Sequence, residues 1–113
     1  MGRPPTESVI EEIKKCFTTD AVVYTQHARS EMRAEEFGPI TDREVCEAVY
    51  NGEVIEEYPQ DRPYPSVLIF GRTSSGRPLH IVCAYASEER LAIVVTVYQP
   101  HPERWDSYRR RKR

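Results

Sequence analysis

Three polar side chains with the chemistry to act on a phosphodiester lie near the two ends of one apolar segment. The segment GRPLHIVCAYASEERLAIVVTVYQP, residues 76–100, carries Arg77 and His80 near its start and Tyr98 near its end. An imidazole titrates near neutrality and can accept or donate a proton. A guanidinium holds a phosphate through two parallel hydrogen bonds, and a phenol donates one to an oxyanion. These residues form a candidate site for cleaving a phosphodiester without a metal.

The same segment is typical of an antiparallel hairpin, with strands at 78–86 and 91–98 joined by a charged turn. Side chains alternate across a strand, so each strand has one bulky face. The bulky sets are Leu79, Ile81, Cys83 and Tyr85 in the first strand and Leu91, Ile93, Val95 and Val97 in the second. We expect both sets to be buried beneath helices, which places His80, Thr96 and Tyr98 together on the opposite, more open face. The alternative is a hydrogen-bonded histidine on a half-exposed face, with no part in catalysis.

The residues around the other two histidines give weaker evidence for a catalytic role. His27 falls in the first turn of a predicted helix, and Glu31, four residues on, is placed to orient its ring. A helix start disfavours additional positive charge, so we expect His27 to be neutral. The alternative is a helix-start histidine that bonds a neighbouring strand or loop. His101 is flanked by prolines and is predicted to lie in a loop.

Basic residues are candidates for binding RNA. Arg33 shares a predicted helix face with Arg29, and either pairs with nearby glutamates or contacts RNA at the sheet opening. The last five residues are all basic and include Arg109, Arg110 and Arg111, whereas the rest of the chain holds 11 basic and 18 acidic residues. An acidic body argues against broad electrostatic binding to nucleic acid. The tail is predicted to bind RNA or an acidic partner, or to be a disordered, solvated end.

The sequence predicts no metal site and no cofactor. Cys16, Cys46 and Cys83 are isolated, so neither a zinc site nor a disulfide framework is indicated, and we expect each to be a small core residue. A Gly-rich phosphate loop is absent too. No apolar run approaches the length of a membrane helix, and the start MGRPPTESV lacks a signal peptide's apolar stretch. We therefore expect a cytoplasmic protein without a membrane partner.

The elements that must position these residues form one domain of α+β class. Helices are predicted over 6–17, 25–37 and 40–52, where Thr41 and Glu44 fit a capping box. Strands are predicted over 21–24, 53–58, 66–73, 78–86 and 91–98. We expect helices on one face of a mainly antiparallel sheet of four or five strands. The chain then divides into an N-terminal helix (1–20), a central domain (21–100) and a C-terminal turn with the basic tail (101–113).

Four motifs together resemble the small bacterial family called domain of unknown function DUF4258. They are the His-Ala-x-x-x-Met run at His27, the Ile-Thr-x-x-x-Val run at Ile40, Gly-Arg-Pro-Leu-His ending at His80 and Thr-Val-Tyr-x-Pro around Tyr98. The resemblance covers about residues 22–100. It implies a RelE-like fold, similar to the RelE and BrnT toxins of bacterial toxin–antitoxin pairs. Those are small α+β proteins, and many of them cleave RNA without a metal.

Two functions follow from the residues and the resemblance. The first is an endoribonuclease of a toxin–antitoxin system, with RNA as substrate and an antitoxin-like protein as partner. His80 or His27 would then act as general base on a ribose hydroxyl, Arg77 and Arg33 would steady the phosphate, and Tyr98 would assist the leaving group. The second is a non-catalytic module that has kept the fold and binds a protein or nucleic acid. A fold alone does not decide between them.

Overall fold

The computed structural model describes residues 6–112, so the segment 1–5 and Arg113, the last residue of the basic tail, lie outside it. The elements in chain order are α1 (Thr6–Thr18), β1 (Val22–Tyr24), α2 (Gln26–Ala34), α3 (Asp42–Tyr50), β2 (Glu53–Tyr58), β3 (Ser66–Arg72), β4 (Pro78–Ala86), β5 (Leu91–Tyr98), β6 (Trp105–Asp106) and β7 (Arg110–Arg111). The predicted strands at 53–58, 78–86 and 91–98 are confirmed at both ends. Helix α2 ends three residues before its predicted end, where the Glu35 side chain accepts a hydrogen bond from the backbone N–H of Gln99.

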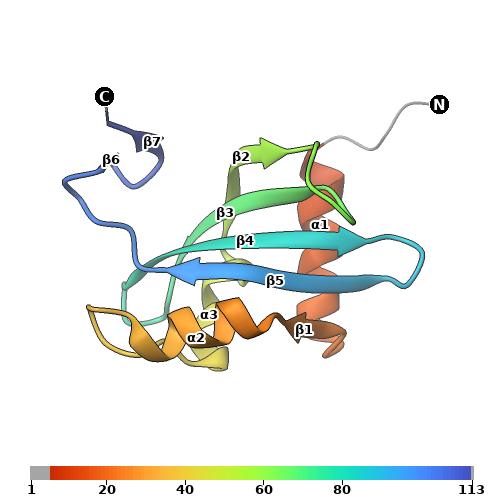
Figure 1. Ribbon diagram of the computed structural model, residues 1–113, viewed down its shortest axis with the longest axis horizontal. Coiled ribbons are helices and arrows are strands. Elements are labelled where there is room, and N and C mark those ends of the chain that lie inside the picture. The colour runs from red at the N-terminus through yellow and green to blue at the C-terminus, as the bar shows by residue number, and fades with distance from the viewer. Residues whose placement is uncertain (1–5, 113) are drawn as a thin grey trace.

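Five strands form one sheet in the order β1-β5-β4-β3-β2 (Figure 1). Neighbouring strands are antiparallel except β1, which pairs parallel with β5. The predicted α+β class and mainly antiparallel sheet are therefore confirmed. Strands β2 to β5 follow one another through short connections, which favour antiparallel pairing. Strand β1 is separated from β5 by two helices and three strands, so it can pair in the parallel direction.

The main core lies between the helices and one face of the sheet. Helix α3 contributes Val45, Ala48 and Val49, which are fully buried, and its predicted capping box of Thr41 and Glu44 is present. Opposite them lie Ile69, Leu79, Ile81 and Cys83 of the sheet. The alternation expected for the strand 78–86 is thus confirmed, because its bulky set points toward the helices.

A β-bulge reverses the expected phase in most of β5. Thr96 pairs with Val82, but Val94 pairs with Cys83, so Val95 is an extra residue in the strand. Val97 is buried under the helices as predicted. On the N-terminal side of the bulge, Ala92 and Val94 take the buried positions, and Leu91 and Ile93 are partly exposed. The prediction that Leu91, Ile93 and Val95 form the buried face is therefore wrong, because the added residue shifts every side chain that precedes it in the strand to the other face.

Helix α2 runs along the free edge of β5 beyond the point where β1 ends. Its Glu31 carboxylate accepts a hydrogen bond from the backbone N–H of Val97, and Glu35 accepts one from Gln99, each at 3.0 Å. The helix begins at Thr25, whose hydroxyl accepts from the Ala28 N–H and donates to the Val95 carbonyl. These side chains satisfy edge groups that the short β1 leaves unpaired.

The C-terminal residues fold back onto the sheet. Strands β6 and β7 form a two-stranded hairpin at one end of β4 and β5 (Figure 1), and Trp105 is buried. A disordered end was one of the expectations for the basic residues 109–113, and for residues 109–112 it is wrong, because β7 pairs with β6 there. The apolar surface of Trp105 provides the reason, because its burial offsets the entropy of ordering a short segment.

We expect Gly71→Ala to lower the free energy of unfolding by about 2–3 kcal/mol, a typical cost of overpacking. A Cβ at this position in β3 would lie 1.8 Å from the carbonyl oxygen of Ala48 in α3, so the helix would have to move. Urea denaturation measures the change. Ser87→Ala, at an exposed turn position, is the control and should change stability by less than about 0.5 kcal/mol. Equal stability of the two variants would contradict this packing.

Candidate functional site

The predicted pairing of His80 with Tyr98 is confirmed. The two residues lie directly opposite each other in β4 and β5, and the Tyr98 hydroxyl is 3.0 Å from the His80 Nδ1 atom. Their rings meet edge to face, with centroids 5.2 Å apart. Both side chains lie on the sheet face away from α1 and α3, as the alternation predicts.

The expectation that this face is open at His80 is wrong. The imidazole has no exposed surface, because the C-terminal hairpin covers it. Trp105 packs edge to face on the ring with centroids 4.4 Å apart, and Phe70 of β3 packs on it at 5.9 Å. The Nε2 atom lies 2.6 Å from the backbone carbonyl oxygen of Tyr108.

These contacts determine the protonation of His80. A carbonyl oxygen only accepts hydrogen bonds, so Nε2 carries the proton and donates a hydrogen bond to the Tyr108 carbonyl oxygen. Nδ1 is then unprotonated and accepts a hydrogen bond from the Tyr98 hydroxyl. Burial lowers the pKa of His80 to about 4, although the hydrogen bond to Tyr108 raises it. Burial also raises the pKa of Tyr98 to about 12. Near neutrality the pair is therefore uncharged, and neither imidazole nitrogen is available to a substrate.

A second polar group borders the covered histidine. Arg111 of β7 donates two hydrogen bonds to the Glu56 carboxylate, at 2.9 and 3.1 Å, and the Tyr58 hydroxyl donates a third at 2.6 Å. The Arg111 guanidinium holds the pKa of the Glu56 carboxyl below its usual range. The sequence predicts no role for Glu56 or Tyr58. Their spacing of two within one strand, which puts both on the same face as His80, is the signal that identifies them.

Arg77 does not face His80. Its guanidinium donates to the carbonyl oxygens of Gly38 and Pro39, to the Gln99 side chain at 2.7 Å and to the Glu44 carboxylate. Glu44 also closes the capping box of α3. Arg77 therefore connects the α2–α3 loop, the start of α3 and the end of β5. Each of its three guanidinium nitrogens is thus engaged away from the His80–Tyr98 pair.

His27 and Arg33 lie on α2. The His27 Nε2 atom is 3.4 Å from the Glu31 carboxylate, which confirms the expected i, i+4 contact, and the His27 side chain is mostly exposed. Arg33 is exposed and has no polar partner among the described residues. Arg29 differs, since it pairs with Asp42 and lies over the Tyr24 ring. Neither His27 nor Arg33 approaches the imidazole of His80.

The three arginines of the tail have unequal surroundings. Arg109 donates to Glu53 at 2.7 Å and its guanidinium lies over the Phe70 ring. Arg111 is held by Glu56 and lies over the Trp105 ring. Arg110 points away from these contacts and is exposed. Only Arg110 of the three is thus without a described partner for its charge.

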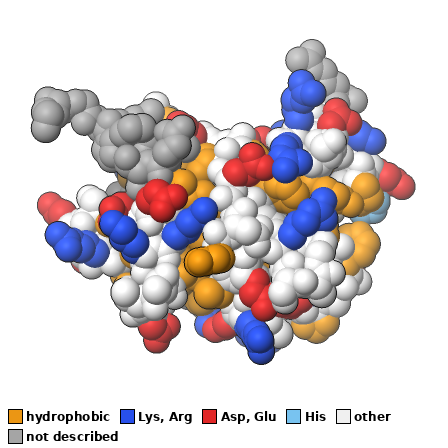
Figure 2. Space-filling model, turned by 180° about the vertical axis from the view of Figure 1, so that it is seen from behind, with side chains coloured by type: hydrophobic (Ala, Val, Ile, Leu, Met, Phe, Trp, Pro, Cys, Tyr) orange, Lys and Arg blue, Asp and Glu red, His pale blue; other side chains and the backbone are white. Residues whose placement is uncertain are grey.

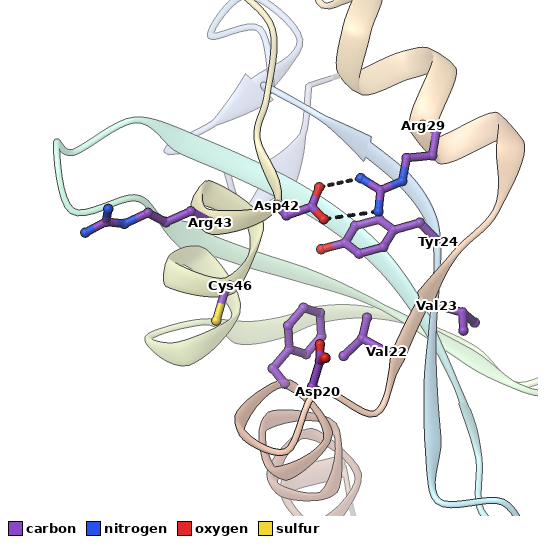
Figure 3. Close-up of a pocket in the computed structure, with 9 residues that line it drawn as sticks. Asp20, Val22, Val23, Tyr24, Arg29, Asp42, Arg43 and Cys46 are labelled. Carbon is purple, nitrogen blue, oxygen red and sulfur yellow. Dashed lines mark hydrogen bonds and ion pairs between the residues drawn. The ribbon is translucent and has the colours of Figure 1, made fainter.

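A cavity of about 600 Å³ lies elsewhere, between the end of α1, the edge strand β1 and α3 (Figure 3). Its lining includes Phe17, Val22, Tyr24 and Cys46, with Asp20 at one end and the Arg29–Asp42 pair at the other. The expectation that Cys46 is buried is wrong. The stripe of Val45, Ala48 and Val49 turns Cys46 outward, whereas Cys16 and Cys83 are buried as expected. The sequence gives no signal for this cavity, because residues of four separate elements, α1, β1, α2 and α3, line it.

Comparison with known proteins gives one match. The model of the family described as "Domain of unknown function (DUF4258)" matches residues 24–99. No curated protein and no solved structure matches the chain. The matched range includes His27, Arg77, His80 and Tyr98, and it ends before the hairpin that covers His80. Within residues 6–112 no cluster of three His, Cys, Asp or Glu side chains is arranged to hold a metal, and no helix could span a membrane.

We expect the buried His80 to make stability fall with acid. The unfolded chain protonates this imidazole near pH 6.5, whereas the folded chain does so only near pH 4. Stability due to the neutral ring is therefore complete above pH 6.5 and declines by up to about 3 kcal/mol as the pH falls to 4. Urea denaturation at a series of pH values measures this. His80→Gln does not titrate and should show a smaller loss; parallel pH curves for the two proteins would contradict the assignment.

We also expect the Arg111–Glu56 pair to help hold the hairpin on the sheet. Trp105 is the only tryptophan in the chain, so its fluorescence reports the hairpin alone. Arg111→Glu places two carboxylates together, and should shift the emission to longer wavelength and increase quenching by acrylamide. The control is Arg110→Glu, which changes the charge equally on the exposed side. An unchanged Trp105 signal in Arg111→Glu would show that the pair does not hold the hairpin.

Proposed function

This chain belongs to the DUF4258 family, and we propose that it is a RelE/BrnT-like domain that acts by binding a partner rather than by cutting RNA. The resemblance to the toxins described above suggests an antitoxin-like protein as the class of partner. The proposal keeps the fold expected of the family and assigns it a non-catalytic role.

One observation carries this choice: both nitrogens of the His80 imidazole are bonded inside the protein, beneath Trp105. A general base needs a free lone pair within reach of the proton it removes. The Nδ1 lone pair accepts from Tyr98, and the low pKa of His80 makes it a weak base. Arg77 is bound to Glu44 and loop carbonyls, so it does not supply a phosphate contact next to His80.

The distribution of charge favours a protein over a nucleic acid. Figure 2 shows acidic and basic side chains interspersed over the face opposite to that of Figure 1, without a broad basic surface. In the tail, Arg109 and Arg111 are neutralised by Glu53 and Glu56. Arg33 and Arg110 stay candidates for an RNA contact, but two isolated cations supply little of the electrostatic attraction that nucleic-acid binding requires.

A metal-independent endoribonuclease is the second candidate function. It is favoured by the gathering of His80, Tyr98, Glu56, Tyr58 and Arg111 on one face of the sheet. If the hairpin lifted, water would reach His80 and its pKa would return toward the ordinary value. His80 would then be able to accept a proton from a ribose hydroxyl, with Glu56 and Tyr98 beside it.

We expect the purified chain to leave RNA intact. The assay incubates it with total RNA, alone and with translating ribosomes, in EDTA to suppress metal-dependent contaminants. His80→Ala and wild type should behave alike, and induced expression of either should not arrest growth through RNA loss. Circular dichroism checks that the variant is folded. RNA fragmentation by wild type that His80→Ala abolishes would overturn the binding role and establish the nuclease.

A further inference from the structure

The two edges of the five-stranded sheet are built differently. β2, at one edge, carries Glu53, Glu56 and Glu57 and has a bulge beside Val54. Charged residues and bulges on an edge prevent another strand from pairing with it. β1, at the other edge, has the sequence Val-Val-Tyr without charge or bulge, and Val23 is 45% exposed. Only the β1 edge therefore lacks side-chain protection against a further strand.

The backbone of β1 is ready to pair on its outer side. The Ala92 N–H donates to the Ala21 carbonyl, and the Thr25 N–H donates to the Val94 carbonyl. In a parallel ladder with this register, Val23 makes the inner hydrogen bonds to β5. The N–H and C=O groups of Val22 and Tyr24 consequently point away from the sheet. An extended polypeptide is the ligand whose alternating donors and acceptors match them.

The cavity lies directly along this edge. In Figure 3 the side chains of Val22 and Tyr24 turn toward it, Cys46 of α3 forms the opposite wall, and Val23 points away. A strand paired with β1 would direct every second side chain into this space. With about 600 Å³ and walls from Phe17, Val22 and Tyr24, the cavity accepts a large apolar side chain. Because β1 has only three residues, this side chain must supply much of the affinity.

The charges at the ends of the cavity indicate which charge the bound segment carries. Asp20, at one end, has no ion-pair partner among the residues whose side chains the structure describes, 9–112. Arg29 and Asp42, at the other end, neutralise each other, and Arg43, which also lines the cavity, pairs with Glu47 at 3.4 Å. The unpaired charge is therefore negative, which favours a basic residue next to the apolar one and disfavours a phosphate backbone.

We propose that β1 and this cavity, together the β1 groove, bind an extended segment of a partner protein as a sixth strand of the sheet. One large apolar side chain of that segment fills the cavity, and a Lys or Arg beside it meets Asp20. This inference deepens the binding role proposed above and rests on it. A second copy of this chain and a single-stranded RNA are the competing occupants, which the experiment separates.

The probe is a displayed library of short linear peptides, selected on the wild-type chain. Val22→Pro removes an outward N–H, and proline is tolerated where a strand's N–H faces solvent. Cys46→Phe fills the cavity from the exposed side of α3, so it tests the groove even if the proline variant fails to fold. Ser87→Ala is the control, because this exposed turn residue lies outside both β1 and the lining of the cavity.

We expect selected peptides to contain a large apolar residue next to Lys or Arg. Their affinity should fall by about ten-fold or more in Val22→Pro and Cys46→Phe, because each of these variants removes contacts worth about 1.4 kcal/mol. It should stay within about two-fold in Ser87→Ala. Bound peptide should also slow alkylation of Cys46, the one exposed cysteine. Circular dichroism confirms that each variant is folded.

Three results would overturn the proposal. The first is a library that yields no peptide, or only peptides that bind wild type and Cys46→Phe equally. The second is a wild-type dimer that Val22→Pro dissociates, which assigns the groove to a second copy. The third is protection of Cys46 by an oligouridylate but not by peptides. Failure here differs from failure of the binding role, since RNA cleavage dependent on His80 is measured separately and does not involve the groove.

Discussion

The two hydrogen bonds of the His80 imidazole are the constraint on which this end of the sheet depends. A buried imidazole needs a partner for each nitrogen, and a missing one costs about 1–3 kcal/mol. Tyr98, on the neighbouring strand, supplies one partner, and the Tyr108 carbonyl, in the C-terminal hairpin, supplies the other. The register of β4 against β5 and the position of the hairpin are therefore coupled through one ring. A shift of either would leave a polar atom buried without a partner.

The hairpin itself depends on this docking. Two-residue strands are too short to be stable alone, so β6 and β7 exist because they pack on the sheet. Burial of the Trp105 ring against His80 contributes most, on the order of 2–3 kcal/mol. The ion pairs of Arg109 and Arg111 are partly exposed, and such pairs add at most about 1 kcal/mol each. Their larger effect is to bring basic residues next to the acidic edge strand β2, which cancels charge on both.

How far the sequence predicts this structure depends on the range of the interactions involved. Turns and alternation are local, so the four strands from β2 to β5 and the facing of His80 and Tyr98 could be predicted. The capping box at Thr41 is equally local. The bulge at Val95 could not be predicted, because residues 91–98 are apolar on both faces and volume alone does not locate an extra residue.

The candidate site was harder to predict because its cover comes from another part of the chain. Residues 101–113 show no hydrophobic periodicity, and their single Trp105 does not indicate where it will pack. Arg77 was expected near His80 because it lies three residues away, yet its long side chain reaches the α2–α3 loop instead. Cys46 and the cavity beside it depend on how α1, β1 and α3 meet. Spacing along a chain specifies neighbours within an element, whereas these contacts join different elements.

Most of the sheet is covered by other parts of the chain, so few of its surfaces are open to a partner. Helices α1 and α3 occupy one face, and the hairpin occupies the His80 end of the other. At the end of β5, Glu31 and Glu35 accept hydrogen bonds from the backbone N–H groups of Val97 and Gln99. The acidic residues of β2 protect its edge. Within the part of the chain that the structure describes, the outward backbone groups of Val22 and Tyr24 have neither of these kinds of cover. Because His80 is enclosed and the outward N–H and C=O groups of Val22 and Tyr24 are not, this fold offers backbone groups at an edge rather than a catalytic side chain, and such groups pair with an extended polypeptide.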